Sequence, residues 1–419
     1  MSGTTNHLAR GALLLLSWSS AAQLALATTW TVDLAGGPGA QFTQISDAIA
    51  AASDGDVIVV RPGLYNQFSL DKGLEIRAEP GAAARAVVRL QNLASSQRAA
   101  IRGLQVVTLH VTNNLGPVVL EQLSVYSDPA LIPFSSSEHL RIDACADVRV
   151  QRSNITSPGG QRGMEAVYVF DARVEFVECT LSAQAGKTSA TGDAGAGGHG
   201  LLVDDHARVH FVRSSTFGGV GGASSGAGAG GEGGDGIHVA GASEVIVAGL
   251  AFDSVVGGAG GAAGSCALNG RGGDGIELVG SCELRTSSVT LSGGTSCSLS
   301  GLALESPLGT VVTPLPPDPV LTVAPPPSGS SMALFTLHAA PGTSAELFLG
   351  RRTLLSPSVN TEIELLAQHA RRIDLGVVPA SGVVQRSVKL PPNTFVVAQV
   401  DALLSAGDFR RTNSCVVFR

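Results

Sequence analysis

The chain has 419 residues, of which 44% are hydrophobic and 15% charged, so it has the composition of a folded protein with more than one domain. Its net charge of −7 is modest and its basic residues form no stripe, which excludes the usual signature of a nucleic-acid-binding protein. The 53 glycines indicate a fold built from tight turns and short strands.

Residues 1–27 have the pattern of a secretory signal peptide. His7 and Arg10 precede a largely apolar stretch, and residues 25–27 (ALA) form a cleavage site. A membrane anchor would need about 20 apolar residues, and this stretch is shorter and interrupted by serines. We therefore expect a secreted, extracellular or cell-surface protein with no membrane span after signal removal.

A short amphipathic helix is predicted over residues 43–53, where Ile45 and Ile49 share one face. It is followed by a turn at residues 54–56 (DGD) and an apolar strand, Val57–Val60. Such a helix would cover the open end of a stack of strands.

From Glu165 onward one strand-forming unit recurs. Its starts lie 34, 36 and 39 residues apart, at Glu165, His199, Asp235 and Asp274. Repeats of this length indicate a solenoid or a propeller. A propeller blade would need four strands without long glycine insertions, so we favour a parallel solenoid. A related apolar pattern lies upstream, at Leu104/Val106, Leu123/Val125 and Ile155.

Each unit is predicted to contain two strands with alternating faces. In the first strand, Ile237 and Val239 point inward and His238 outward. The second strand carries an apolar column and a charged column. The apolar column is Val174, Val209, Val245 and Leu284, and the charged column is Arg173, Arg208, Glu244 and Glu283.

Glycine-rich loops separate the units. In residues 218–236, 11 of 19 residues are glycine, and residues 257–275 are similar. Such loops cannot pack a core of their own, so we expect them to emerge together from one side of the solenoid.

The N-terminal segments 42–49 (FTQISDAI), 54–60 (DGDVIVV) and 62–65 (PGLY) carry a family resemblance. They resemble the opening of pectin-lyase-like right-handed parallel β-helix proteins, over residues 28–305. The resemblance implies the fold, but this superfamily contains lyases, hydrolases, isomerases and adhesins, so it implies no single activity.

Residues 306–330 contain eight prolines and are predicted to form a linker. Residues 331–419 lack the repeat and have short apolar runs, which predict a small antiparallel β-domain, sandwich-like in form. Residues 345–350 (AELFLG) and 412–413 (TN), among others, resemble the C-terminal β-domain that ends many bacterial secreted proteins. The fold class is therefore all-β throughout.

The six cysteines fit an oxidising compartment. They allow 15 pairings, which the sequence does not distinguish. Cys266, Cys282 and Cys297 lie close together, so we expect one bridge among them. The sequence contains no C-x-x-C pair, so it predicts neither a zinc ribbon nor a thioredoxin-like site.

The candidate catalytic residues are those that begin the repeats: Glu165, His199, Asp235 and Asp274. Stacked one coil apart, at about 4.8 Å, they could act as an acid–base pair or bind a calcium ion. The simpler interpretation is that each caps backbone N–H groups at a turn.

A second polar cluster, Asp204, Asp205 and His206, is a candidate binding site. The simpler interpretation is a solvated surface, because a metal site would need further converging ligands. We assign no metal site and no cofactor beyond the calcium ion.

The function favoured by the sequence is a structural, adhesive or glycan-binding role at the cell surface, with extracellular polysaccharide or cell-surface components as partners. The alternative is a polysaccharide lyase or glycoside hydrolase. A hydrolase would need paired carboxylates about 5–9.5 Å apart, which stacked aspartates could supply. Against both enzymes, aromatic platforms for sugar rings are scarce: beyond residue 27 the chain has one Trp and three Tyr.

Overall fold

The computed structural model describes residues 27–126, 139–157, 163–249, 253–287, 289–306, 311–314, 320–324, 332–350, 371–389, 395–403, 409–411 and 415–418. The predicted signal peptide lies outside the described residues, apart from Ala27. Among the described residues, no helix has the length and hydropathy that crossing a membrane would require.

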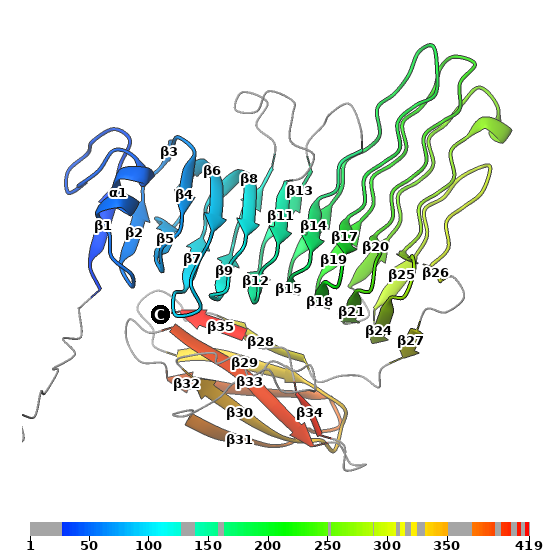
Figure 1. Ribbon diagram of the computed structural model, residues 1–419. Coiled ribbons are helices and arrows are strands. Elements are labelled where there is room, and N and C mark those ends of the chain that lie inside the picture. The colour runs from blue at the N-terminus through cyan, green and yellow to red at the C-terminus, as the bar shows by residue number, and fades with distance from the viewer. Residues whose placement is uncertain are drawn as a thin grey trace, which may run out of the picture.

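The chain forms a right-handed parallel β-helix followed by a small antiparallel β-domain (Figure 1). Each strand of the coil pairs in parallel with the equivalent strand one coil away, which builds two long sheets. Sheet A contains β1 (Thr29–Val32), β2 (Val57–Val60), β5 (Glu75–Ala78), β7 (Ala99–Arg102), β9 (Val118–Glu121), β12 (Val148–Gln151), β15 (Arg173–Val177), β18 (Arg208–Val212), β21 (Glu244–Ala248), β24 (Glu283–Ser287) and β27 (Val311–Pro314).

Sheet B is continuous in the first coils and split in the later ones. The first coils contribute β3 (Gly63–Leu64), β4 (Phe68–Leu70), β6 (Ala84–Gln91) and β8 (Gln105–Thr112). One branch then contains β10 (Ser124–Val125), β13 (Asn154–Thr156), β16 (Thr180–Ser182), β19 (Ser215–Phe217), β22 (Ser254–Val256) and β25 (Thr290–Ser292). The other contains β11 (Leu140–Asp143), β14 (Val167–Phe170), β17 (Leu201–Asp204), β20 (Ile237–Val239), β23 (Ile276–Leu278) and β26 (Leu304–Glu305).

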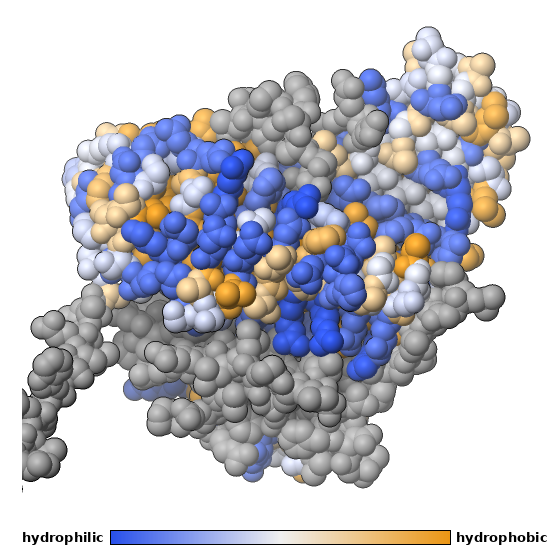
Figure 2. Space-filling view, viewed as in Figure 1, coloured by the Kyte–Doolittle hydropathy of each residue, from blue (hydrophilic) through white to orange (hydrophobic). Residues whose placement is uncertain are grey.

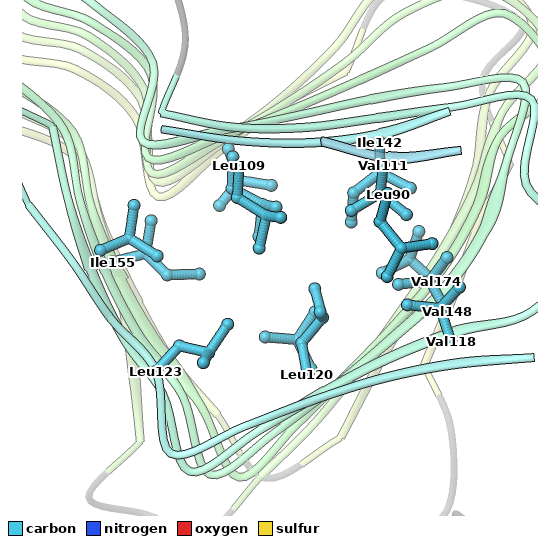
Figure 3. Close-up of a cluster of buried hydrophobic side chains, with 14 of the residues drawn as sticks. Leu90, Leu109, Val111, Val118, Leu120, Leu123, Ile142, Val148, Ile155 and Val174 are labelled. Atoms are coloured by element: carbon cyan, nitrogen blue, oxygen red, sulfur yellow. The ribbon is translucent and has the colours of Figure 1, made fainter. Parts of the chain in front are cut away.

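The core runs along the axis of the coil as stacked columns of aliphatic side chains (Figure 3). Val118, Val148 and Val174 form one column because parallel pairing places the same strand position in successive coils. The predicted column continues through Val209 and Val245, which are both fully buried. Alternation of inward apolar and outward polar residues therefore determines which face of each strand enters the core.

Residues with positive φ turn the chain at two corners of several coils. Gln122 (φ 53°) stands between β9 and β10, and Asn113 (φ 55°) follows β8. Most of these residues are not glycine, although the left-handed region is unfavourable for other residues. Most of the non-glycine residues among them, Gln122 and Asn113 included, donate their N–H to a carbonyl of the next coil, which holds them in place.

The helix α1 (Ile45–Ala51) lies at the N-terminal end of the coil and confirms the predicted cap, with bounds shorter than residues 43–53. Its buried residues Ile45, Ala48 and Ile49 join the core of the first coils. The end of the stack is thereby covered by apolar side chains.

The C-terminal domain contains two antiparallel sheets, as its apolar runs predict. One contains β28 (Val320–Ala324), β29 (Met332–His338) and β32 (Val383–Lys389). The other contains β30 (Ser344–Gly350), β31 (Arg371–Val377), β33 (Phe395–Leu403), β34 (Phe409–Arg411) and β35 (Cys415–Phe418). Leu321, Phe335 and Leu347 belong to its buried core.

The predicted linker, 306–330, contains two strands, so it is not linker throughout. The strand β27 extends sheet A of the coil, and β28 pairs with β29 of the C-terminal domain. A proline at the end of a strand does not prevent that strand from pairing, and Pro314 stands at the end of β27. The number of prolines in this segment was therefore a poor guide to where the linker lies. The other seven prolines of this segment lie outside the described residues.

Cys266 and Cys297 form a disulfide, which confirms the bridge expected within this group. Cys266 belongs to the 3-10 helix η1 (Cys266–Leu268) in one glycine-rich loop, and Cys297 lies in the next loop. Cys145, Cys179 and Cys282 are free and buried in the coil. The side chain of Cys415 lies outside the described set.

Candidate functional site

The glycine-rich loops connect the two branches of sheet B in successive coils. They project side by side and form an extension of the coil, here called the blade (Figure 1, upper right). The blade consists of residues 183–200, 218–236, 257–275 and 293–303. Upstream, the unbroken strand β8 pairs with both β10 and β11, whereas in later coils the loop separates the two branches. The blade is therefore an insertion within one face of the coil, and the loops emerge together as predicted.

The blade is ordered by backbone hydrogen bonds with a period of three residues. The Gly221 N–H donates to the Ala259 carbonyl of the next coil (2.8 Å), and the Gly231 N–H donates to the Gly222 carbonyl of the opposite limb (2.9 Å). A Cβ on Gly231 would overlap the Gly195 carbonyl, because neighbouring limbs are in backbone contact. Three residues per turn is the period of the polyproline II and collagen helices, so a Gly-Gly-x repeat fits this packing.

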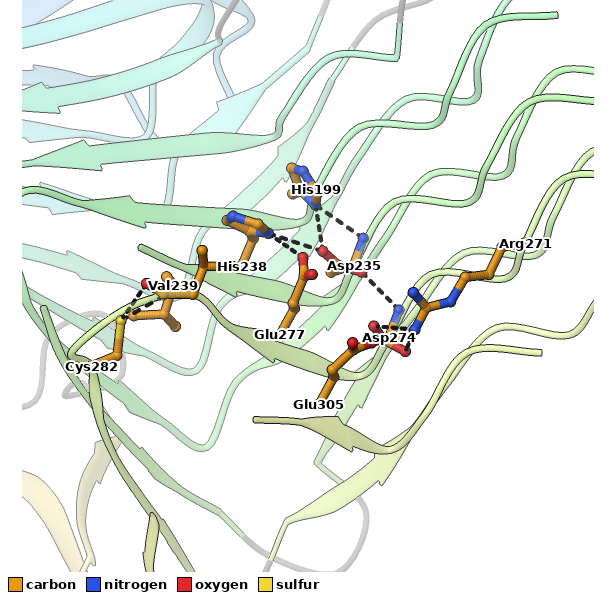
Figure 4. Close-up of polar contacts among 10 residues, drawn as sticks. His199, Asp235, His238, Val239, Arg271, Asp274, Glu277, Cys282 and Glu305 are labelled. Carbon is orange, nitrogen blue, oxygen red and sulfur yellow. Dashed lines mark hydrogen bonds and ion pairs between the residues drawn. The ribbon is translucent and has the colours of Figure 1, made fainter. Parts of the chain in front are cut away.

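Three of the four predicted catalytic candidates, His199, Asp235 and Asp274, lie where the returning limbs of the blade rejoin the coil (Figure 4). The Asp235 N–H donates to His199 Nδ1 (3.1 Å), and the Asp274 N–H donates to Asp235 Oδ1 (2.7 Å). The Leu302 N–H continues the series by donating to Asp274 Oδ1. Each side chain therefore caps a backbone N–H one coil away, in agreement with the simpler interpretation of this column.

Glu165, the first member of the predicted column, lies one coil before His199. It is in register with His199, because the N–H of the following Ala166 donates to the His199 carbonyl (3.1 Å). Glu165 does not belong to either group of converging ligand atoms found among the described residues.

A second column, on the outward face of sheet B, completes the site. His238 of β20 is in register with Glu277 of β23, which is in register with Glu305 of β26. His238 Nδ1 lies 3.1 Å from Asp235 Oδ2 and 2.6 Å from Glu277 Oε2. Strand alternation placed His238 outward, but the predicted site did not include it. The signal was present in the sequence, since His238 and Glu277 each follow an aspartate by three residues.

The electrostatics of this cluster favour an ionised carboxylate beside a protonated imidazole. Burial opposes the charge on His238, but hydrogen bonds to Asp235 and Glu277 outweigh it and raise the pKa of His238 to about 9. Burial likewise opposes the charge on Asp235, while hydrogen bonds from His199 and His238 hold its pKa well below the usual value. The His199 and His238 rings lie 4.6 Å apart between centres.

A neighbouring acidic cluster is already occupied by a protein cation. Arg271 Nη2 lies 3.0 Å from Asp274 Oδ2 and also contacts Glu305. Burial and a hydrogen bond with Glu305 raise the pKa of Asp274 to about 6, whereas the same bond and Arg271 lower the pKa of Glu305. Calcium prefers such an all-oxygen ligand set, but the guanidinium of Arg271 takes the position of the cation here.

Asp204, Asp205 and His206 lie at the corner between β17 and β18 and are largely exposed or half-buried. His206 Nδ1 contacts Asp205 Oδ1 (2.9 Å), and the Asp205 N–H donates to Asp204 Oδ1 (2.8 Å). These are contacts between sequence neighbours at a turn. The geometry therefore matches a solvated surface, and the structure brings no further ligand to these residues among those that it describes.

Upstream on the same outward face, two arginines stack on two of the three tyrosines of the chain. The Arg141 guanidinium carbon lies 5.0 Å from the centre of the Tyr168 ring, and that of Arg85 lies 5.9 Å from the Tyr126 ring. Tyr168 is in register with Arg141 of the preceding coil. The sequence did not reveal this face, because the coils differ in length and their register is set by pairing.

No protein-family model matches the chain, and a comparison with curated proteins finds no significant match. The parallel β-helix therefore rests on the strand pairing and the core described above.

Proposed function

We propose that this protein is a secreted, pectin-lyase-like β-helix that binds an acidic extracellular polysaccharide without cleaving it. The outward face of sheet B, near Arg141 and Tyr168, is the proposed binding surface. The C-terminal β-domain would then extend or attach this scaffold at the cell surface.

The observation that carries the proposal is the pair of stacked Arg–Tyr contacts on the outward side of the parallel sheet B. An aromatic ring offers a flat apolar surface with a polar edge, which suits the face of a sugar ring. Guanidinium groups recognise carboxylates by charge-assisted hydrogen bonds. Arg89 and His110 lie beside Arg141 in the same register, so the face carries several basic groups in a line, of which Arg141 also pairs with Asp143 (2.6 Å).

The state of the carboxylates supports binding over catalysis. Asp235 and Asp274 accept backbone N–H groups of the next coil, and Arg271 neutralises Asp274 and Glu305. A glycosidase needs one carboxylic acid and one carboxylate that are both free to meet the substrate. In this column the carboxylates maintain the fold.

The test is a binding and cleavage assay on the purified mature protein with polygalacturonate, alginate and a neutral glucan. We expect the acidic polymers to bind and to remain intact, with neither unsaturated products nor new reducing ends. Tyr168→Ala and Arg141→Ala should each weaken binding by about 10-fold, because each removes roughly 1.4 kcal/mol of contact energy.

Arg77 provides the matched control. It is a half-exposed arginine of β5 on sheet A, so Arg77→Ala should leave binding unchanged. Equal loss in all three variants, or no binding to any acidic polymer, would contradict the proposed surface. Release of products that is abolished by Asp235→Asn and Asp274→Asn would make the protein an enzyme.

A further inference from the structure

We propose that His199, Asp235 and His238 bind one divalent transition-metal ion, with Glu277 as a fourth ligand. The ligand atoms of the first three residues lie within 4.8 Å of one another. His199 Nδ1 and His238 Nδ1 lie 3.0 and 3.1 Å from Asp235 Oδ2. A tetrahedral ion with ligands at 2.0–2.1 Å separates them by ~3.3 Å, so only small shifts are needed.

The donor set selects the class of metal. Two imidazole nitrogens with carboxylate oxygens suit Zn²⁺, Co²⁺, Ni²⁺ and Cu²⁺. Ca²⁺ and Mg²⁺ prefer oxygen ligands throughout, and the adjacent cluster that would offer these is occupied by Arg271. The proposed ion is therefore a zinc-like ion and not calcium.

The hydrogen bonding around the two histidines leaves room for a cation. His199 Nδ1 faces the N–H of Asp235 at 3.1 Å and the carboxylate of Asp235 at 3.0 Å. If His199 Nδ1 is protonated, its N–H points at the N–H of Asp235, which is also a donor. If it is unprotonated, its lone pair faces the carboxylate of Asp235, which is also an acceptor. His238 Nδ1 similarly faces two carboxylates, from Asp235 and Glu277, although it has one proton to donate. A metal ion bound by the two imidazole nitrogens and by the carboxylates of Asp235 and Glu277 would replace the proton of His238, and the Asp235 N–H would give up His199 Nδ1 as its acceptor.

The architecture holds these groups in place before the ion arrives. His199 and Asp235 end returning limbs of the blade in adjacent coils, while His238 and Glu277 lie on paired strands. Their side chains are 27%, 7%, 19% and 28% exposed, so the ion has a path from solvent. Preorganised ligands on rigid elements favour tight binding.

The experiment is a titration of tag-free, EDTA-stripped protein with Zn²⁺ in competition with a chromophoric chelator. We expect one ion per chain. His199→Ala and His238→Ala should each lower Zn²⁺ affinity by more than the roughly 10–100-fold that the loss of an outer-shell partner costs. The visible spectrum of Co²⁺ should show intense tetrahedral bands in the wild-type protein and lose them in both variants.

His206 supplies the matched control, because it pairs with Asp205 at the surface without a second imidazole. His206→Ala should retain full affinity for Zn²⁺. Circular dichroism of the metal-free variants tests folding, and Glu277→Gln gives a milder variant should either alanine variant unfold. Absence of stoichiometric Zn²⁺ binding, or full affinity in the His199, His238 and Glu277 variants, would overturn the site. This outcome is separate from polysaccharide binding, which involves Arg141 and Tyr168.

Discussion

Polar side chains of the coil make their hydrogen bonds to groups of the neighbouring coils. Asp235 accepts the N–H of Asp274, while its other oxygen faces two histidines. An aspartate before glycine predicts the cap from local sequence alone. The histidine contacts depend on the register between coils, so local reasoning found His199 and Asp235 but left out His238 and Glu277.

His210 on β18 gives a test at this scale. Burial, followed by repulsion from Arg173, Arg285 and Arg208, lowers the pKa of His210 from 6.5 to about 4 in the folded protein. The folded state thus binds its proton less readily than the unfolded state. His210 should therefore destabilise the fold progressively as the pH falls from about 6.5 to about 4, and this half-buried side chain should cost on the order of 1–3 kcal/mol.

The measurement is urea unfolding of wild type and His210→Gln at pH 7 and pH 4. We expect the wild type to lose more stability than the variant over this range, because the variant has no imidazole to protonate. Other titrating groups are common to both proteins and cancel in the difference. Parallel pH profiles would show that His210 is readily protonated in the folded state.

The strands have a two-residue period of side-chain direction, whereas the blade has a three-residue period of backbone hydrogen bonds. Only the first of these periods could be recognised from the sequence. Alternation of apolar residues, as in Val167 and Val169, gave the strands and their inward faces correctly. The blade has a three-residue period and no side-chain core. Its order comes from backbone contacts between limbs such as those of Gly222 and Gly231, which propensity does not describe.

Glycine substitutions test the blade as an element. Gly231→Ala should destabilise the protein by about 1–3 kcal/mol, because the new methyl group must displace a neighbouring limb. Gly264→Ala is the control, since the nearest atom to its Cβ is 3.8 Å away. Thermal unfolding compares the two variants. Equal melting temperatures would show that the limbs are not in backbone contact at Gly231.

At the scale of the whole molecule, sheet A lies against the C-terminal domain (Figure 1). Arg152 donates to the Val323 carbonyl (3.1 Å) and pairs with the buried Glu121. Hydrophilic side chains are spread over much of the coil in this view, with hydrophobic ones between them (Figure 2). Binary patterning predicted both all-β domains, but contacts between them join residues far apart in sequence and carry no local signal.

The blade must be an ordered extension of the coil if it is to position His199 and Asp235. Hydrogen–deuterium exchange of the folded protein tests it most directly. We expect the hydrogen-bonded glycine amides within residues 218–222, 230–234 and 257–261 to exchange as slowly as those of β18 and β21, since both sets donate to backbone carbonyls of neighbouring limbs or strands. Exchange of the glycine segments at the rate of free peptide, beside protected strands, would contradict the blade and the metal site at its base.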